Sequence, residues 1–302
     1  MKVTTLITVA TTCLATTAFG ADLAYKAPRL AAVEPPSPWD IAFGGSIVSD
    51  YLFRGLTQSA HDPSASVFFS PMYNVNQNLQ FYVGFSTESV KLRNSPAAEV
   101  DVWGGIRASF GPVAFDVGGW SYNYPGKEDF YVADWAAPYP GIVAAGGVPG
   151  NFVEAYGKFT WTVAPWLAVG ANVNYSPDFL ATTAEGTYVA GLAKITAPAT
   201  VLPSGIGAYL SGEFGHQYLG TTDGGADLPD WNTWNVGVGF TWKAFTLDLR
   251  YTDTDLSKAD CFTLTGDPHA TLLAGGTIES NWCGARFTAK LSAATTVFSL
   301  MK

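Results

Sequence analysis

The most constraining feature of this sequence is a strict alternation of apolar and other residues over 234–251. Both halves of the run alternate, and they are separated by a two-residue turn at 243–244. The apolar positions are Trp234, Val236, Val238, Phe240, Trp242, Phe245, Leu247, Leu249 and Tyr251. Because side chains of a strand alternate between its faces, the run predicts a hairpin with one apolar and one polar, charged face. Aromatic residues at the ends of the apolar rows are typical of membrane-barrel strands.

Similar segments recur along the chain and predict twelve strands. The first is expected at 39–53, with Ile41, Phe43, Ile47, Tyr51 and Phe53 on one face, and the last at 282–292. The connections are alternately long and short, which is the rhythm of a barrel with short periplasmic turns and longer outer loops. We therefore predict an all-β fold, a single up-and-down transmembrane antiparallel β-barrel of about twelve strands spanning residues 39–302.

The N-terminus indicates export. Lys2 precedes a mildly apolar stretch at 6–19, and small residues stand at Ala18 and Gly20, so residues 1–20 are predicted to be a cleaved secretory signal. Residues 21–38 are rich in Pro and Ala and are expected to form a flexible periplasmic segment. No other run is apolar enough for a transmembrane helix. We expect a location in the outer membrane of a Gram-negative bacterium, with lipid, lipopolysaccharide and the barrel assembly machinery as partners.

The overall charge excludes one class of partner. The formal net charge is -9, and basic stripes are missing, which argues against binding of nucleic acid. No cofactor motif and no metal-binding motif are present in the sequence. The last two outer loops are acidic and are expected to form a solvated rim, with binding of divalent cations or a weak cation preference as the alternative. Their acids are Asp223, Asp227, Asp230, Asp253, Asp255, Asp260, Asp267 and Glu279.

The polar faces of the predicted strands carry both signs of charge. If these faces point inward, the pore-lining charges are Asp101, Arg107, Asp116, Glu154, Lys158, Glu213, Asp248, Arg250, Arg286 and Lys290. Inward placement is expected because an Arg or Lys facing lipid at mid-depth costs about 2–4 kcal/mol. Two interpretations stay open. The charges line a water-filled pore, or they form an ion-paired ladder that braces a closed barrel.

Several residues outside the strands have competing interpretations. Cys261 and Cys283 remain after signal removal, and an even number in an oxidising compartment predicts a disulfide. The connection 123–150 is apolar enough either to fold into the mouth of the barrel or to cap its rim. A barrel hydrolase would need a nucleophile beside a histidine. The candidate is His216, because His61 and His269 fall in loops, but no catalytic serine motif accompanies it.

The segment Ser49–Ser59, S-D-Y-L-F-R-G-L-T-Q-S, resembles the TorF family of porins. A proline follows the motif, here Pro63, and weaker matches occur at 98–101, 115–118 and 122–126. The motif residues are Asp50, Tyr51, Phe53, Arg54, Gly55, Gln58 and Ser59. The resemblance implies an outer-membrane barrel with passive transport and transfers no catalytic residue. Asp50 and Arg54 are expected to join the lumen charges as a pair.

These observations predict a porin-like channel for passive diffusion of small hydrophilic solutes or ions, and not an enzyme. The first alternative is a closed structural or adhesive barrel, in which the inward charges only brace the wall. The second is an outer-membrane hydrolase that uses His216.

Overall fold

The computed structural model describes residues 38–127, 150–203 and 205–301. The predicted signal 1–20, nearly all of the segment 21–38, and most of the connection 123–150 lie outside these residues. The predictions made for them therefore stay predictions.

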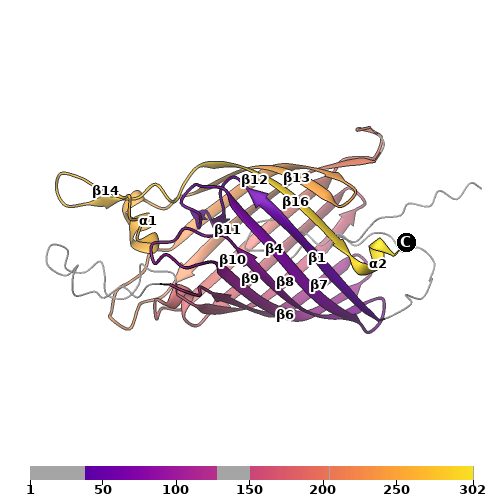
Figure 1. The fold of residues 1–302 in the computed structure, drawn as a ribbon, viewed down its shortest axis with the longest axis horizontal. Coiled ribbons are helices and arrows are strands. Elements are labelled where there is room, and N and C mark those ends of the chain that lie inside the picture. Colours follow the sequence, from indigo (N-terminus) through magenta and orange to yellow (C-terminus); the bar gives the residue numbers. More distant parts are fainter. Residues whose placement is uncertain (1–37, 128–149, 204, 302) are drawn as a thin grey trace, which may run out of the picture.

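The described chain forms a closed antiparallel barrel of twelve strands (Figure 1). Each strand pairs with its neighbours in the sequence, and β1 pairs with β16 to close the cylinder. The wall strands are β1 (Trp39–Val48), β4 (Ser64–Asn74), β5 (Leu79–Glu88), β6 (Glu99–Phe110), β7 (Val113–Asn123), β8 (Phe152–Ala164), β9 (Leu167–Ser176), β10 (Gly186–Thr196), β11 (Ile206–Leu219), β12 (Trp231–Trp242), β13 (Phe245–Thr254) and β16 (Arg286–Thr296). The predicted all-β up-and-down barrel is confirmed.

The outer face of the barrel is apolar. Ile47, Val67, Val117 and Leu210 alternate with inward residues and are 60%, 58%, 52% and 48% exposed. Aromatic side chains stand at strand ends on the side of the barrel that carries the short turns. They include Trp39, Phe110, Trp166, Trp242 and Phe245. Such a surface would be unfavourable in water, because exposed apolar patches of this extent drive association.

The small elements lie at the two ends of the barrel. α1 (Lys258–Thr265), β14 (Thr271–Leu272) and β15 (Ile278–Glu279) belong to the last long connection, at the opposite end from α2 (Val297–Leu300) (Figure 1). The end with α1 and β14 carries the long connections, and we call it the outer end. Within the described part of the chain, no helix combines the length and apolarity needed to cross a membrane.

Two predicted boundaries were wrong. The first wall strand ends at Val48 instead of continuing to Phe53, and Tyr51 and Phe53 are buried instead of facing outward. The chain after Val48 leaves the wall and turns into the barrel. The last strand runs over Arg286–Thr296, four residues later than predicted at each end, and Trp282 is buried before it begins.

Candidate functional site

The segment after β1 forms a hairpin inside the outer end of the barrel. β2 (Leu52–Phe53) and β3 (Leu56–Thr57) pair across a two-residue turn at Arg54 and Gly55. Both turn residues have positive φ, 48° and 89°, as a tight hairpin turn requires. We call residues 49–59 the plug. They coincide with the motif that carried the resemblance.

Aromatic side chains pack the plug against the barrel wall. The Phe53 ring lies 5.8 Å from Tyr122 on β7, 6.4 Å from Phe152 on β8 and 6.3 Å from Phe179, measured between ring centroids. Phe179 lies in the short 3-10 helix η2 (Phe179–Ala181) and also contacts Trp231 on β12. All five side chains are at least 93% buried. The plug therefore packs a buried aromatic core against several strands of the barrel wall.

Arg54 anchors the tip of the plug to the wall. Its guanidinium forms an ion pair with Glu154 on β8 at 2.7 Å, and the two side chains are only 7% and 1% exposed. It also donates to Gln217 on β11 at 2.7 Å and lies over the Tyr188 ring on β10. The indole of Trp231 donates to the Arg54 carbonyl at 2.9 Å. One residue thus ties the plug to four strands of the wall, β8, β10, β11 and β12.

The base of the plug has its own polar network. Asp50 accepts hydrogen bonds from Thr57 at 2.5 Å and Ser59 at 3.2 Å, and it contacts His61 at 2.8 Å. Arg286 on β16 lies 4.0 Å from Asp50. The predicted pairing of Asp50 with Arg54 is wrong, because the hairpin turn sends Arg54 across the lumen toward Glu154 and leaves Asp50 at the entrance.

The remaining lumen charges form local groups. Arg107 on β6 binds Asp116 on β7 at 2.9 Å, and these side chains are 29% and 19% exposed. Arg250 binds Asp248 at 2.9 Å on the same strand, β13. Glu213 accepts a hydrogen bond from the Tyr188 hydroxyl at 2.6 Å.

All ten predicted pore-lining residues lie at inward positions of their strands, opposite the exposed apolar rows. Lys158 lies over the Tyr156 ring, and Lys290 stands opposite Asp248 in the strand register. The pairs Arg107–Asp116 and Arg250–Asp248 are local to one part of the wall, whereas Glu154 and Arg286 face charged residues of the plug. Whether the ten residues line a water-filled pore stays a prediction.

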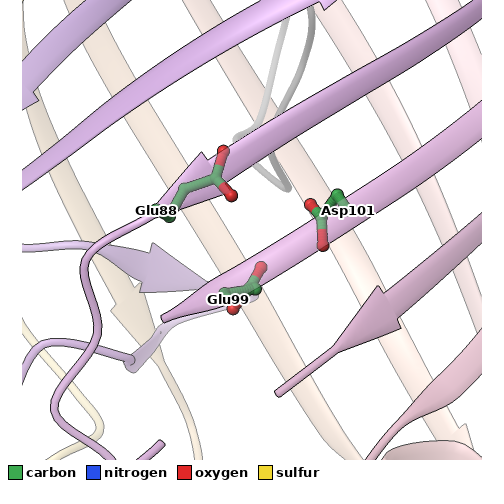
Figure 2. Close-up of side chains that lie close together, drawn as sticks. All are labelled: Glu88, Glu99 and Asp101. Carbon is green, nitrogen blue, oxygen red and sulfur yellow. The ribbon is translucent and has the colours of Figure 1, made fainter. Parts of the chain in front are cut away.

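A buried group of three carboxylates was missed by sequence reasoning. Glu88 at the end of β5 stands directly opposite Glu99 at the start of β6, and Asp101 follows on the same face. One oxygen of each lies within 4.8 Å of the others, and all three residues are at least 98% buried (Figure 2). Asp101 was predicted as a pore-lining charge. The two glutamates were missed because the strand register that brings them beside Asp101 cannot be read from the sequence.

The plug reaches this group through Tyr51. Its hydroxyl donates to Glu99 Oε1 at 2.7 Å. Burial, reinforced by the nearby Glu99 carboxylate, raises the pKa of Tyr51 well above its ordinary value. The hydroxyl therefore keeps its proton and remains a donor. Tyr51 and Arg54 thus bind two carboxylates on different parts of the wall.

The outer loops are held by the predicted disulfide, since Cys261 in α1 is bonded to Cys283. Cys283 precedes β16, and it forms an isolated bridge with Leu56 of the plug. The disulfide therefore connects α1 to a segment that pairs with the plug. Asp267, expected on a solvated rim, is instead 2% exposed and accepts a hydrogen bond from Ser280 at 2.8 Å.

The candidate catalytic histidine lies on the opposite face from the lumen charges. His216 shares the outward row of β11 with Phe214 and Tyr218, whereas Glu213 points inward. Its Nδ1 contacts Asn232 Oδ1 at 2.8 Å. The alternation of a strand separates His216 from Glu213, so these two residues do not form an acid–base pair.

Comparison with known sequences gives a family. Residues 32–274 match a family described as a bacterial protein of unknown function, Gcw_chp. The chain belongs to the Gcw_chp family. This match covers the plug and most of the barrel, and it does not confirm the resemblance to the TorF family. No curated protein matches this Gcw_chp chain significantly.

Solved structures similar to this Gcw_chp chain are barrels. The KdgM porin is 8% identical, with 84% of this chain and 98% of that chain covered and a TM-score of 0.45. The NanC porin is 7% identical, with 85% and 98% covered and a TM-score of 0.42. LpxR from Salmonella typhimurium is 8% identical, with 84% and 99% covered and a TM-score of 0.39. Likenesses this distant do not distinguish among functions.

Proposed function

We propose that the protein is a porin-like channel of the bacterial outer membrane, whose outer mouth is held shut by the plug. The solutes would be small and hydrophilic, or ions. The proposal depends on a difference in side-chain exposure between the outer mouth and the interior of the barrel. At the mouth the plug side chains are buried in an aromatic core, whereas Arg107 and Asp116 in the barrel remain 29% and 19% exposed.

The outer surface supports the location. Exposed apolar side chains cover the outer face of the strands, aromatic residues stand at their ends, and the charged residues point inward. This distribution is the one expected of a barrel in lipid. A soluble barrel would place polar residues on the outer face, because water contacts that face.

Conduction through the barrel would depend on the position of the plug. It forms hydrogen bonds or an ion pair with β6, β8, β11 and β12, so the mouth is occupied across its width. Passage of a solute would require the plug to undock. The aromatic core between the plug and the wall supports a second candidate function, a closed structural barrel in which the plug never moves.

The test compares the refolded mature protein with a variant in which residues 52–57 are replaced by a Gly-Ser linker of equal length, both in planar bilayers. We expect rare openings for the wild type and steady, salt-proportional current steps for the variant. Folding is checked by heat-modifiable migration of the barrel. A correctly folded but silent variant would reject the channel and leave the closed structural barrel.

The proposed function needs no catalytic residue. The hydrolase alternative depended on His216, whose outward position and contact with Asn232 give it no nucleophile in the lumen. We expect the refolded protein to leave lipid and ester substrates unchanged. Hydrolysis by the wild type that disappears in His216→Ala would reverse this conclusion.

A further inference from the structure

We propose that Glu88, Glu99 and Asp101 bind one divalent cation and that Ca²⁺ is the ion they suit best. The three side chains gather at the ends of β5 and β6 (Figure 2), where Tyr51 of the plug contacts Glu99. One carboxylate oxygen of each lies within 4.8 Å of the others. The site does not depend on conduction through the barrel, so it can be tested separately from the proposed channel.

The carboxylates lack the partners that a buried ionised group needs. Glu88 is 2% exposed and Asp101 is 0% exposed, and none of their four oxygens has a hydrogen-bond partner among the described residues. Ser86 lies beside Glu88 and Trp120 beside Asp101, so the polar neighbours of these two carboxylates include uncharged donors whose geometry is too poor for a regular hydrogen bond. A buried charge without a partner is strongly unfavourable. The geometry therefore calls for a positive group that the described side chains do not supply in full.

The strand register makes this need stronger. Glu88 stands directly opposite Glu99, and Asp101 lies two residues further on the same face. Like charges directly opposite each other destabilise a sheet. Glu99 also accepts a hydrogen bond from Tyr51 at 2.7 Å, so the plug orients its carboxylate. A cation shared by the three carboxylates would convert this repulsion into attraction.

Charge and donor type indicate the class of ion. The Lys290 ammonium acts electrostatically on Glu88. Three carboxylates carry more negative charge than one ammonium offsets, so a divalent cation suits the group better than a monovalent one. All donors are oxygens, which suit Ca²⁺ and Mg²⁺ rather than softer metals. A group of three carboxylates favours Ca²⁺, because Mg²⁺ is usually held by one or two carboxylates and keeps several of its waters.

The same ion would connect the wall to the plug. Tyr51 belongs to the plug and donates to Glu99, so an ion that orients the Glu99 carboxylate also orients the acceptor of that hydrogen bond. Ligands that bind only the docked state stabilise it. Ca²⁺ is therefore expected to slow undocking of the plug, and chelation to accelerate it. This consequence, unlike the site, rests on the proposed function.

The first measurement uses the refolded full-length protein after treatment with EGTA. Calorimetric titration with CaCl₂ is expected to show one saturable site per chain. Tb³⁺, which replaces Ca²⁺ and emits when a nearby indole is excited, is expected to luminesce on excitation of tryptophan, because Trp120 lies beside Asp101. Ca²⁺ should quench this emission by competition. Equal competition by Mg²⁺ would overturn the choice of Ca²⁺.

Variants separate this site from the acidic outer loops. Glu88→Gln and Asp101→Asn preserve side-chain shape and are each expected to weaken Ca²⁺ binding at least tenfold. Asp223→Asn removes one exposed carboxylate from an outer loop and is the matched control, with unchanged affinity expected. Retained binding in folded Glu88→Gln, or loss in Asp223→Asn, would overturn the proposal. The lack of a saturable Ca²⁺ site in the wild type would also overturn the proposal, and this test does not depend on the folding of any variant.

Discussion

Removal of Arg54 tests whether the plug is held by a buried ion pair. Arg54 and Glu154 are 7% and 1% exposed and lie 2.7 Å apart. In Arg54→Ala, Glu154 would keep its hydrogen bonds from Tyr122 at 3.2 Å and Asn174 at 3.1 Å but lose its charge partner. Leaving one buried charge of a pair uncompensated costs about 3–5 kcal/mol. Undocking the plug returns Glu154 to water, so the docked state bears this cost.

The expected effect is large enough to measure by hydrogen exchange. A cost of about 3–5 kcal/mol raises the undocking equilibrium about 150- to 5,000-fold. The Gln58 amide donates to Tyr51 at 2.6 Å, and the Thr57 amide donates to Trp282 at 2.8 Å. Hydrogen exchange of these amides should accelerate by the same factor, provided that the plug redocks faster than an exposed amide exchanges. Mass spectrometry of peptides covering 50–60 gives the rates.

A second variant identifies the cause. Arg54→Met with Glu154→Gln removes both charges and retains an acceptor for the Tyr122 hydroxyl, so most of the protection should return. Arg107→Ala removes a lumen cation that pairs with Asp116 and is the control, with exchange of the plug unchanged. Wild-type protection in Arg54→Ala, or the same loss of protection in the double variant, would refute the argument.

Three further predictions concern the plug, the loops and the lumen. Gly55→Ala should destabilise the docked plug by about 1–3 kcal/mol, because φ is 89° and the new Cβ would lie 3.0 Å from a threonine oxygen; exchange rates equal to wild type would contradict this. Reduction of Cys261–Cys283 should accelerate proteolysis of α1 while the heat-modifiable barrel persists, and a reduced barrel that unfolds without heating would count against it. Arg107→Ala with Arg250→Ala should raise the cation preference of any channel current, and an unchanged reversal potential would remove these residues from the pore.

The barrel itself was predictable because its signal is local. The alternation in strands such as β12 and β13 places Val236 and Leu247 outward and Asn235 and Asp248 inward, and this follows from the period of a strand alone. The structure confirms it at these positions. The disulfide was also predictable, since only two cysteines lie outside the predicted signal and the expected export favours their oxidation.

The plug was not predictable, because Tyr51 and Phe53 continue the alternation of β1. If β1 continued, these aromatic side chains would face lipid, whereas in a hairpin that enters the barrel they pack in the lumen. The local sequence pattern is the same in both cases and cannot distinguish them. Gly55 is the one signal that could have suggested the turn. The pairing of Arg54 with Glu154 spans 100 residues of sequence and depends on closure of the barrel.

The sequence by itself determined the alternating strands, because the period of a strand depends on residue type at short, regular spacing. The barrel was inferred from the number of strands and the rhythm of their connections, and the disulfide from the number of cysteines. Tertiary structure alone decided what occupies the lumen. It brought Glu88 opposite Glu99, carried Tyr51 to the same place and turned Arg54 toward β8. The physical reason is that strand register and the path of the plug are set by packing between distant segments, which leaves no periodic trace in the sequence.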